Sequence, residues 1–367
     1  MRIACFFATS GHSGVDRLAR HLLPALARRG YQVDLLKIRN HGPELAADTP
    51  GLRVLDLGVR HTLTALPGLI AYLKRAQPDV LLTDKDRVNR LALAARTIAS
   101  VSTRLILRIG TTVSVDLASR NRLECWVQRR SIRFLYPLAD RVLVPSQGAA
   151  DDLACYTGLD RRHIQAVPSP IVPASLFENT LPPPDHPWFA PGEPPVILGL
   201  GELCARKDFA TLIRAFARVR AQRPCRLMIL GRGRQRERLL MLTAELGMSR
   251  DVEFPGFVPG PYAYLDHARL FVLSSRWEGL PFALVEALAV GTPAVATDCP
   301  SGPREVLEGG RYGRLVPVGD DCALAEAIDA TLDAPLPRAV LQQTARRFEI
   351  ESATSAYLEA MGLPERL

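Results

Sequence analysis

The chain has 367 residues, of which 47% are hydrophobic and 23% are charged, and its formal net charge is +8. This length exceeds one typical hydrophobic core, so the sequence predicts two domains. No run approaches the ~18 uncharged apolar residues that a membrane span requires. The seven cysteines are scattered and form no C-x-x-C pair, which indicates neither a disulfide framework nor a zinc site and favours a reducing cytoplasm.

Apolar strand-like runs alternate with helical patterns through the first half of the chain. The expected strands are residues 2–7, 32–38, 80–83, 104–108 and 141–145. This alternation predicts parallel α/β layers. A glycine-containing turn between the first strand and the first helix ends at Gly14, where backbone N–H groups can approach an anion. Arg17, in the first turn of that helix, is either a site residue or a surface residue.

Most of the excess positive charge lies in residues 1–180. It is concentrated in five arginines that are interleaved with aromatic and aliphatic side chains: Arg120, Arg122, Arg129, Arg130 and Arg133. A helix of this kind can rest on an anionic lipid surface. The alternative is an amphipathic helix that packs on its own sheet and turns a basic face to water. No nucleic-acid recognition motif accompanies the charge, so we expect no nucleic-acid partner.

A proline-rich segment follows at residues 181–195 and is unsuited to a helix or an interior strand. It predicts a linker between an N-terminal domain at 1–180 and a C-terminal domain at 196–345. A second alternating series begins after it, with strands at 196–200 and 226–230 and helices at 209–221 and 236–246. The sequence therefore predicts two doubly wound α/β domains.

Glu278 and Glu286 stand eight residues apart, between a buried strand-like run at 270–275 and a helix. Gly279 permits a sharp turn, and Pro281 suits the first position of a helix because its missing N–H is no loss there. Free backbone N–H groups at a helix start suit a phosphate, while carboxylates on either side can accept hydrogen bonds from sugar hydroxyls. Such a site can hold a diphosphate flanked by two sugars.

The run SRWEGLPFALVEALAVGTPAVATDCP, from Ser275 to Pro300, resembles the E-x7-E segment of retaining glycosyltransferases of family GT4. The similarity extends over about residues 201–320. It implies a GT-B fold, in which two Rossmann-like domains face a cleft and a last helix at about 346–362 returns to the first domain. It also implies that Glu278 contacts the donor sugar and Glu286 the nucleotide ribose. The residues around them complete the donor site: Ser275, Gly279, Leu280, Pro281 and Phe282.

Other donor contacts follow from the same resemblance. Lys207 matches the lysine of the family's G-R-L-x-x-x-K segment, which grips the diphosphate, but Glu202 stands at the arginine position. Arg206 is then the expected second cation, and Glu202 must point away or pair with it. Additional contacts are expected from the G-x-G turn, from backbone near the base and from the first domain: Gly231, Gly233, Val258 and Gly14.

Relatives in this family place a histidine or an aspartate near the donor sugar after the strand at 104–108, where this chain has Gly110. Arg108, Thr111 and Asp116 are the candidates to replace it. Expected acceptor contacts are Arg17, Asp84, Asn89 and Thr111. Asp84 and Asp86 also imitate a D-x-D metal motif, but Arg206, Lys207 and helix amides can neutralise a leaving diphosphate, so we expect no metal.

The resemblance implies a metal-independent hexosyl or related transfer, with retention. The expected co-substrate is a UDP- or GDP-sugar, with no other cofactor, and the expected acceptor is a glycan or lipid-linked glycan in cell-surface polysaccharide or glycolipid assembly. The expected location is cytoplasmic, including the inner face of the membrane. Two alternatives stay open: a nucleotide-sugar epimerase of the same fold, and a catalytically degenerate carbohydrate-binding or scaffold protein. A dinucleotide oxidoreductase is disfavoured because the G-L-G at 199–201 lacks a third glycine.

Overall fold

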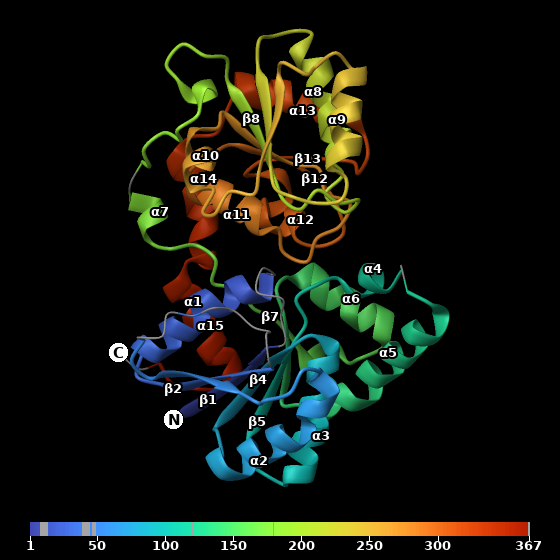
Figure 1. Cartoon of the computed structure of the whole chain (residues 1–367), viewed down its shortest axis with the longest axis vertical. Coiled ribbons are helices and arrows are strands. Elements are labelled where there is room, and N and C mark those ends of the chain that lie inside the picture. Colours follow the sequence, from blue (N-terminus) through green and yellow to red (C-terminus); the bar gives the residue numbers. More distant parts are fainter. Residues whose placement is uncertain (8–13, 39–44, 46–48, 119, 179, 366–367) are drawn as a thin grey trace. The chain divides into compact units, whose positions relative to one another are not determined.

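The computed structural model describes residues 1–7, 14–38, 45, 49–118, 120–178 and 180–365. The chain forms two compact units (Figure 1). The first unit comprises Met1–Ile171 and Phe348–Leu367, and the second comprises Val172–Arg347.

The first unit is built on a seven-stranded parallel sheet with the order β3-β2-β1-β4-β5-β6-β7. The strands are β1 (Arg2–Phe7), β2 (Gln32–Lys37), β3 (Leu52–Asp56), β4 (Val80–Asp84), β5 (Arg104–Arg108), β6 (Arg141–Val144) and β7 (Ile164–Ala166). The central strands are almost wholly buried because helices cover both faces of a parallel sheet. This burial explains why they read as continuous apolar runs in the sequence.

The helices of this unit lie on both faces of the sheet (Figure 1). They are α1 (Gly14–Arg28), α2 (Leu66–Ala76), α3 (Asp86–Ala99), α4 (Val113–Ala118), α5 (Arg122–Leu135), α6 (Gln147–Thr157) and α15 (Ile350–Met361). Short 3-10 turns are η1 (Thr62–Ala65), η2 (Tyr136–Leu138) and η3 (Arg161–His163). Leucines of α1 and α15 fill the core on one face, whereas α2, α3 and α6 fill the core on the other.

The second unit holds a six-stranded parallel sheet with the order β10-β9-β8-β11-β12-β13. Its strands are β8 (Val196–Leu200), β9 (Arg226–Leu230), β10 (Val252–Gly256), β11 (Leu270–Leu273), β12 (Ala294–Thr297) and β13 (Arg314–Val316). The strand order reverses between β8 and β11. In open α/β sheets such a switch point is where ligands bind, outside the carboxyl ends of the strands.

Eight α-helices belong to the described part of the second unit. They are α7 (Ser175–Glu178), α8 (Phe209–Arg220), α9 (Arg236–Glu245), α10 (Tyr262–His267), α11 (Phe282–Ala289), α12 (Pro303–Val306), α13 (Asp321–Asp333) and α14 (Arg338–Ala345). The 3-10 turns are η4 (Pro187–Phe189) and η5 (Glu308–Gly310), while η6 (Arg346–Phe348) spans the boundary between the units. Apolar residues of α8 and α13 share one core with the strands, while α11 packs beside α10 and α14.

The boundary between the units lies earlier than the sequence predicted, after Ile171 rather than at residue 180. The proline-rich segment belongs to the second unit. The Leu181 N–H donates to Asp266 at 2.7 Å, and the Arg226 guanidinium lies 5.0 Å from the Trp188 ring centroid. Prolines cannot extend a strand ladder, but their neighbours still pack on the surface of a domain.

The C-terminal helix α15 belongs to the first unit, so the chain passes between the units twice. Arg29 holds α15 against α1, because its guanidinium donates to the Ser355 hydroxyl at 2.9 Å and to the Glu351 carboxylate at 3.0 Å. Among the helices that the structure describes, none combines the length and the apolar character needed to cross a bilayer.

Candidate functional site

Two loops meet at the switch point of the second sheet, one after β8 and one after β11. The first carries Arg206 and Lys207, and the second carries Ser275 and Glu278. Lys207 Nζ lies 2.7 Å from Oε1 of Glu278, and Nη1 of Arg206 lies 2.7 Å from Oε2. The Ser275 hydroxyl also donates to Oε1, at 2.7 Å. The fold therefore brings together four side chains that the sequence predicted for one site.

Backbone contacts hold these two loops together. The Ser274 hydroxyl donates to the Lys207 carbonyl at 2.8 Å, and the Arg276 N–H donates to the Arg206 carbonyl at 2.7 Å. Asp208 adopts a left-handed conformation, with φ of 45°, and its carboxylate pairs with Arg276 at 3.0 Å. The position of Lys207 is therefore set by both loops. No local pattern predicts these contacts, since the partners are about seventy residues apart in the sequence.

Glycines allow a third loop to pack against the first. A Cβ atom on Gly231 would lie 1.8 Å from the Gly201 carbonyl oxygen, and one on Gly233 would lie 2.4 Å from the Leu203 carbonyl oxygen. The Leu203 N–H donates to the Arg232 carbonyl at 2.9 Å. The G-x-G turn after β9 is therefore required by close packing of backbone. Its contact with a nucleotide base stays a prediction, as does that of Val258, which follows β10 and is partly exposed.

The charges in this cluster are unequal. Glu278 and Lys207 are 5% and 8% exposed, whereas the Arg206 side chain is 32% exposed. Burial by itself would raise the pKa of Glu278, but the charges of Lys207 and Arg206 outweigh it and hold that pKa below its ordinary value. Glu278 is therefore ionised at neutral pH. Two cations face one carboxylate, which leaves positive charge to attract an anion. Glu202 is exposed, and Arg206 pairs with Glu278 rather than with it.

The turn at 279–281 leads into α11, which begins at Phe282, so Pro281 stands one residue before the helix rather than at its first position. The Pro281 carbonyl accepts the N–H groups of Leu284 at 3.0 Å and Val285 at 3.2 Å, which closes the first turn of the helix. Gly279 and Phe282 are partly exposed, and Leu280 is buried. Glu286 is fully buried on α11. Its predicted contact with a ribose stays a prediction.

Ser301 is a site residue that the sequence did not reveal. Its hydroxyl donates to the Glu278 carbonyl at 2.8 Å and contacts the Gly279 carbonyl at 3.3 Å. The next residue, Gly302, has φ of +91°, and a Cβ there would lie 2.6 Å from Cδ of Pro281. The turn after β12 thus supports the loop that carries Glu278. The Ser-Gly pair signals a turn, but only the fold shows which loop it supports.

In the first unit, the predicted site residues lie at the carboxyl ends of β4 and β5. Asp84 pairs with Nη1 of Arg108, and both side chains are buried. Asn89 is fully buried, accepts from the Thr83 hydroxyl at 2.7 Å and donates to the Arg108 carbonyl at 3.0 Å. These contacts do not favour the acceptor roles expected for Asp84 and Asn89. They also occupy Arg108, one of the candidates to replace the family's histidine or aspartate.

The remaining predictions for this unit concern residues at the start of α1 and residues that follow β5. Gly14 is the first residue of α1, and the turn before it lies outside the described residues. Arg17 and Thr111 are both partly exposed. Asp116 pairs with Arg120 at 3.0 Å. Arg108 and Asp116 are therefore both held in ion pairs, and Thr111 stays a candidate to replace the family's histidine or aspartate.

The D-x-D pair is held by neighbouring side chains. Asp84 pairs with Arg108, while Asp86 pairs with Arg90 at 2.7 Å and accepts from the Tyr136 hydroxyl at 3.0 Å. Within the part of the chain that the structure describes, no three His, Cys, Asp or Glu side chains are grouped so as to hold a metal ion.

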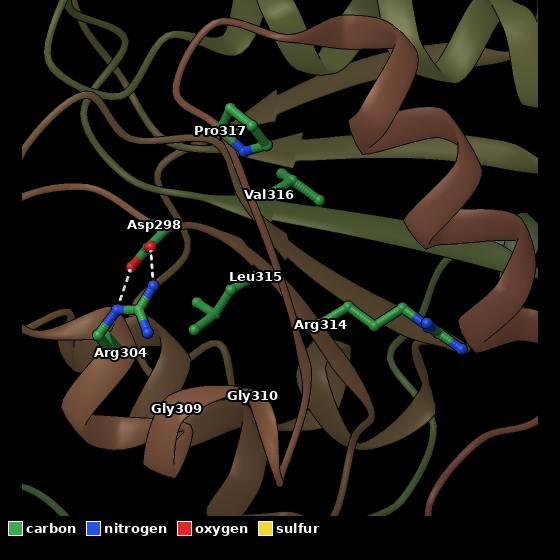
Figure 2. A pocket seen from close by; sticks show the side chains of 8 residues that line it. All are labelled: Asp298, Arg304, Gly309, Gly310, Arg314, Leu315, Val316 and Pro317. Atoms are coloured by element: carbon green, nitrogen blue, oxygen red, sulfur yellow. Dashed lines mark hydrogen bonds and ion pairs between the residues drawn. The ribbon is translucent and has the colours of Figure 1, made fainter.

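A separate open hollow lies beside β12 and β13 (Figure 2). It is lined by Asp298, Arg304, Gly309, Gly310, Arg314, Leu315, Val316 and Pro317. In Figure 2, Arg304 faces Asp298, and its Nε donates to Oδ1 at 3.0 Å. The rest of its lining consists of the exposed Arg314, two glycines, and the apolar side chains of Leu315, Val316 and Pro317. It includes none of the residues that the sequence predicted for the site, whereas the cluster around Glu278 joins four of them. We therefore place the candidate site at that cluster.

Two family descriptions match nearly all of the chain. The family described as glycosyl transferases group 1 matches residues 185–348, and the glycosyl transferase 4-like domain matches residues 13–170. The chain belongs to the GT4 glycosyltransferases. The family that the E-x7-E segment indicated is thus confirmed, and so is the enzyme class, a glycosyltransferase.

Two curated relatives are similar across most of the chain, and a third across about half of it. A Campylobacter jejuni protein named N-acetylgalactosamine-N,N'-diacetylbacillosaminyl-diphospho-undecaprenol 4-alpha-N-acetylgalactosaminyltransferase is 28% identical, over 90% of each chain. The amylovoran biosynthesis glycosyltransferase AmsD of Erwinia amylovora is 27% identical, over 83% of this chain and 82% of its own. The lipopolysaccharide core biosynthesis glycosyltransferase LpsE of Rhizobium meliloti is 34% identical, over 47% of this chain and 51% of its own.

Solved structures show the same fold. The lipopolysaccharide outer core galactosyltransferase WaaB has a TM-score of 0.76 at 20% identity, with 99% of both chains covered. Anabaena HepE in complex with UDP has a TM-score of 0.78 at 16% identity, covering 99% of this chain and 100% of its own. Together with the two parallel sheets, these similarities confirm the predicted GT-B class.

Proposed function

We propose that this chain transfers a hexosyl or related sugar, with retention of configuration, from a UDP-sugar to a lipid-linked glycan during assembly of a cell-surface polysaccharide. The donor would bind at the carboxyl ends of β8 and β11, and no metal ion would be needed. The observation that carries this proposal is the cluster of Arg206, Lys207 and Glu278, in which two cations face a single carboxylate.

The roles of these residues follow from the charges of the reaction. As the bond between the anomeric carbon and the phosphate oxygen breaks, negative charge grows on the diphosphate and positive charge on the sugar. Cations that are already in position stabilise this transition state more than the ground state. We assign Lys207 and Arg206 to the diphosphate, where the backbone N–H groups at the start of α11 would assist them. Neutralisation by these groups is the basis for proposing a metal-independent reaction.

Glu278 would have two tasks. Its two oxygens accept hydrogen bonds from Arg206 and Lys207 at 2.7 Å each and so hold both cations in place. With donor bound, its oxygens would accept hydrogen bonds from hydroxyls of the sugar, as ionised carboxylates do. Ser275 fixes one oxygen of Glu278 and so limits its orientation. Glu286 lies further along the chain, on α11, and is assigned to the ribose because the family pattern places it there.

Retention requires the acceptor hydroxyl to approach the face that the diphosphate leaves. The new bond joins the acceptor oxygen to the anomeric carbon while the bond to the diphosphate oxygen breaks. The hydroxyl proton passes to that diphosphate oxygen, so charge and atoms balance without a protein nucleophile. The side chains of the cluster then act by position and charge alone.

The relatives support the choice of substrates. Anabaena HepE has been solved with UDP and with UDP-glucose, which favours UDP over GDP as the carrier. The name of the Campylobacter jejuni relative includes a diphospho-undecaprenol acceptor, and other relatives are named for lipopolysaccharide core and amylovoran biosynthesis. These names favour a lipid-linked glycan acceptor and a role in cell-surface polysaccharide assembly.

The first test is thermal unfolding of the full chain with UDP-glucose, UDP-galactose, UDP-N-acetylglucosamine and GDP-mannose. A ligand at a hundred times its Kd stabilises the folded state by about 2.7 kcal/mol, so a true donor should raise the unfolding midpoint by several degrees. Glu278→Gln and Lys207→Ala should reduce that shift. If none of the nucleotide sugars raises the midpoint, the donor site is wrongly placed.

The second test is product analysis with the donor so found and diphospho-undecaprenol glycans as acceptors. We expect a product whose new linkage has the anomeric configuration of the donor, determined by NMR, and undiminished activity in EDTA. An inverted linkage would contradict retention. Conversion of the nucleotide sugar to its epimer without an acceptor would instead identify an epimerase.

A further inference from the structure

Helix α5 presents an apolar face to solvent. Of its 14 residues, all of them described, Ile132 alone is buried. Leu123 is 70% exposed, Trp126 57% and Phe134 58%. An ordinary surface helix of a globular protein turns such side chains toward the core. The exposed face of α5 is therefore an interaction surface that its own domain does not cover.

These residues lie on one side of the helix. At 100° per residue, Leu123, Val127, Arg130 and Phe134 follow each other at spacings of three or four and lie opposite Ile132. Val127 is 41% exposed. The apolar stripe continues past the helix end into η2, where Leu138 is 56% exposed. Figure 1 shows α5 at the outer edge of the first unit, beside α6.

Arginines are interleaved with this stripe. The Arg130 guanidinium carbon lies 5.6 Å from the ring centroid of Trp126 and 5.9 Å from that of Phe134, and Arg133 lies 5.8 Å from Phe134. Between residues 120 and 135 there are five arginines and a single acidic residue, Glu124. The same face is therefore both apolar and strongly basic.

We propose that this face of α5, with Leu138, docks the protein on the surface of an anionic lipid bilayer. The apolar stripe would enter the boundary between headgroups and acyl chains while the arginines meet lipid phosphates. Long arginine side chains suit this position, because their stems lie along apolar surface while their charges remain in water. The alternative of a helix packed on its own sheet would require these apolar residues to face inward. The inference goes beyond the proposed function and is independent of it, since docking needs neither donor nor transfer.

Vesicle flotation of the full chain tests this directly. We expect the protein to float with phosphatidylcholine vesicles that contain phosphatidylglycerol and not with pure phosphatidylcholine. Trp126 emission should shift to shorter wavelength on binding, and a Trp126→Phe protein should lose that shift while it still floats. A wild-type chain that does not bind the anionic vesicles overturns the proposal.

Two variants separate the contributions of charge and apolar surface. A triple variant of exposed arginines is Arg122→Gln, Arg130→Gln and Arg133→Gln. Each arginine near an anionic surface contributes about a fivefold gain in partitioning, so this variant should bind about a hundredfold more weakly. A triple variant of the apolar stripe is Leu123→Ser, Trp126→Ser and Phe134→Ser. It should also lose binding, with an unchanged unfolding midpoint because these side chains are exposed.

Matched controls come from exposed positions of the second unit. The charge control is Arg214→Gln, Arg238→Gln and Arg250→Gln, and the apolar control is Leu240→Ser with Met241→Ser. Both should bind vesicles as the wild type does. Equal losses in the controls and the α5 variants would overturn the assignment to α5. A different set of results would assign the face to a second copy of the chain instead. In that case the wild type forms dimers in light scattering, and the variant of the apolar stripe does not dimerise but still binds vesicles.

Discussion

Each unit has a charged cluster at the carboxyl ends of its parallel strands, and the two clusters differ in composition. In the first unit, Asp84 and Arg108 form a buried pair of one acid and one base, and Arg108 also donates to the Tyr357 hydroxyl at 3.0 Å. In the second unit, Arg206 and Lys207 share the single carboxylate of Glu278, and Arg206 is partly exposed.

This difference separates a structural pair from a binding site. Burial opposes the charged form of Arg108, yet Tyr357 and Asp84 raise its pKa above the ordinary value, so the pair is charged and internally neutral. Tyr357 comes from α15, so the pair also fastens the C-terminal helix to the first sheet. The cluster around Glu278 keeps excess positive charge near solvent. Charge balance and exposure, rather than the presence of charged residues, therefore distinguish the two sites.

The largest expected effect is on the stability of the first unit. Arg108→Met leaves the Asp84 carboxylate buried without its cation, so it should lower the free energy of unfolding of this unit by about 3–5 kcal/mol. Urea denaturation measures the change. The double variant Asp84→Leu with Arg108→Met should recover most of the loss, because no charge is then buried. A single variant as stable as the wild type would contradict the structural role.

The next effect is on catalysis in the second unit. Lys207→Ala should lower kcat by about 10²–10³-fold, the usual loss when one preorganised donor to a developing charge is removed. Its stability should change much less than that of Arg108→Met, because Arg206 still pairs with Glu278. The matched control is Lys74→Ala on the exposed side of α2, which should retain full activity. A Lys207→Ala enzyme of normal kcat but low stability would reverse the comparison.

The pH dependence of stability gives a third, smaller effect. Lys207 and Arg206 hold the pKa of Glu278 below its ordinary value despite burial, so the folded state binds fewer protons than the unfolded state at acidic pH. The stabilisation is fully present above the unfolded pKa of about 4.3 and is lost as the pH falls through the folded pKa. The difference in unfolding free energy between wild type and Glu278→Gln should therefore be constant near neutral pH and shrink below about pH 4.

A matched substitution of an exposed glutamate, Glu237→Gln on α9, controls for the general loss of a carboxylate. Its difference from the wild type should stay small throughout the pH range. The difference in unfolding free energy between the wild type and Glu278→Gln could instead grow as the pH falls. That result would show that pairing with the two cations does not determine the pKa of Glu278.

The smallest effect concerns Gly110, where relatives carry a histidine or an aspartate. A Cβ atom there would lie 2.8 Å from Nη1 of Arg108, so Gly110→Ala should destabilise the first unit by about 1–3 kcal/mol. Gly68→Ala on α2 is the control, because its Cβ would meet ordinary contacts at 3.8 Å and alanine favours a helix by about 0.5–1 kcal/mol. Thermal unfolding compares the two. A neutral Gly110→Ala would show that the Arg108 side chain can move aside.

The sequence by itself determined the alternation of strands and helices, the family and the candidate residues of the second unit. These features are local: a buried parallel strand reads as an apolar run, and Lys207, Ser275 and Glu278 each stand in a recognisable turn next to one. It did not predict the support from Ser301, the end of the first unit at Ile171 or the burial of Asn89. Those depend on which loops the sheet order makes neighbours.

Tertiary structure alone decided which charges are neutralised. Asp84 and Arg108 end adjacent strands and pair across the sheet, whereas Lys207 and Glu278 meet because β8 and β11 adjoin at the switch point. It also decided that α5 turns its apolar residues outward, since an amphipathic pattern has the same period whichever side faces the core. Sequence gives the chemistry and spacing of side chains, but contacts between distant segments fix their burial, and burial sets what their charges can do.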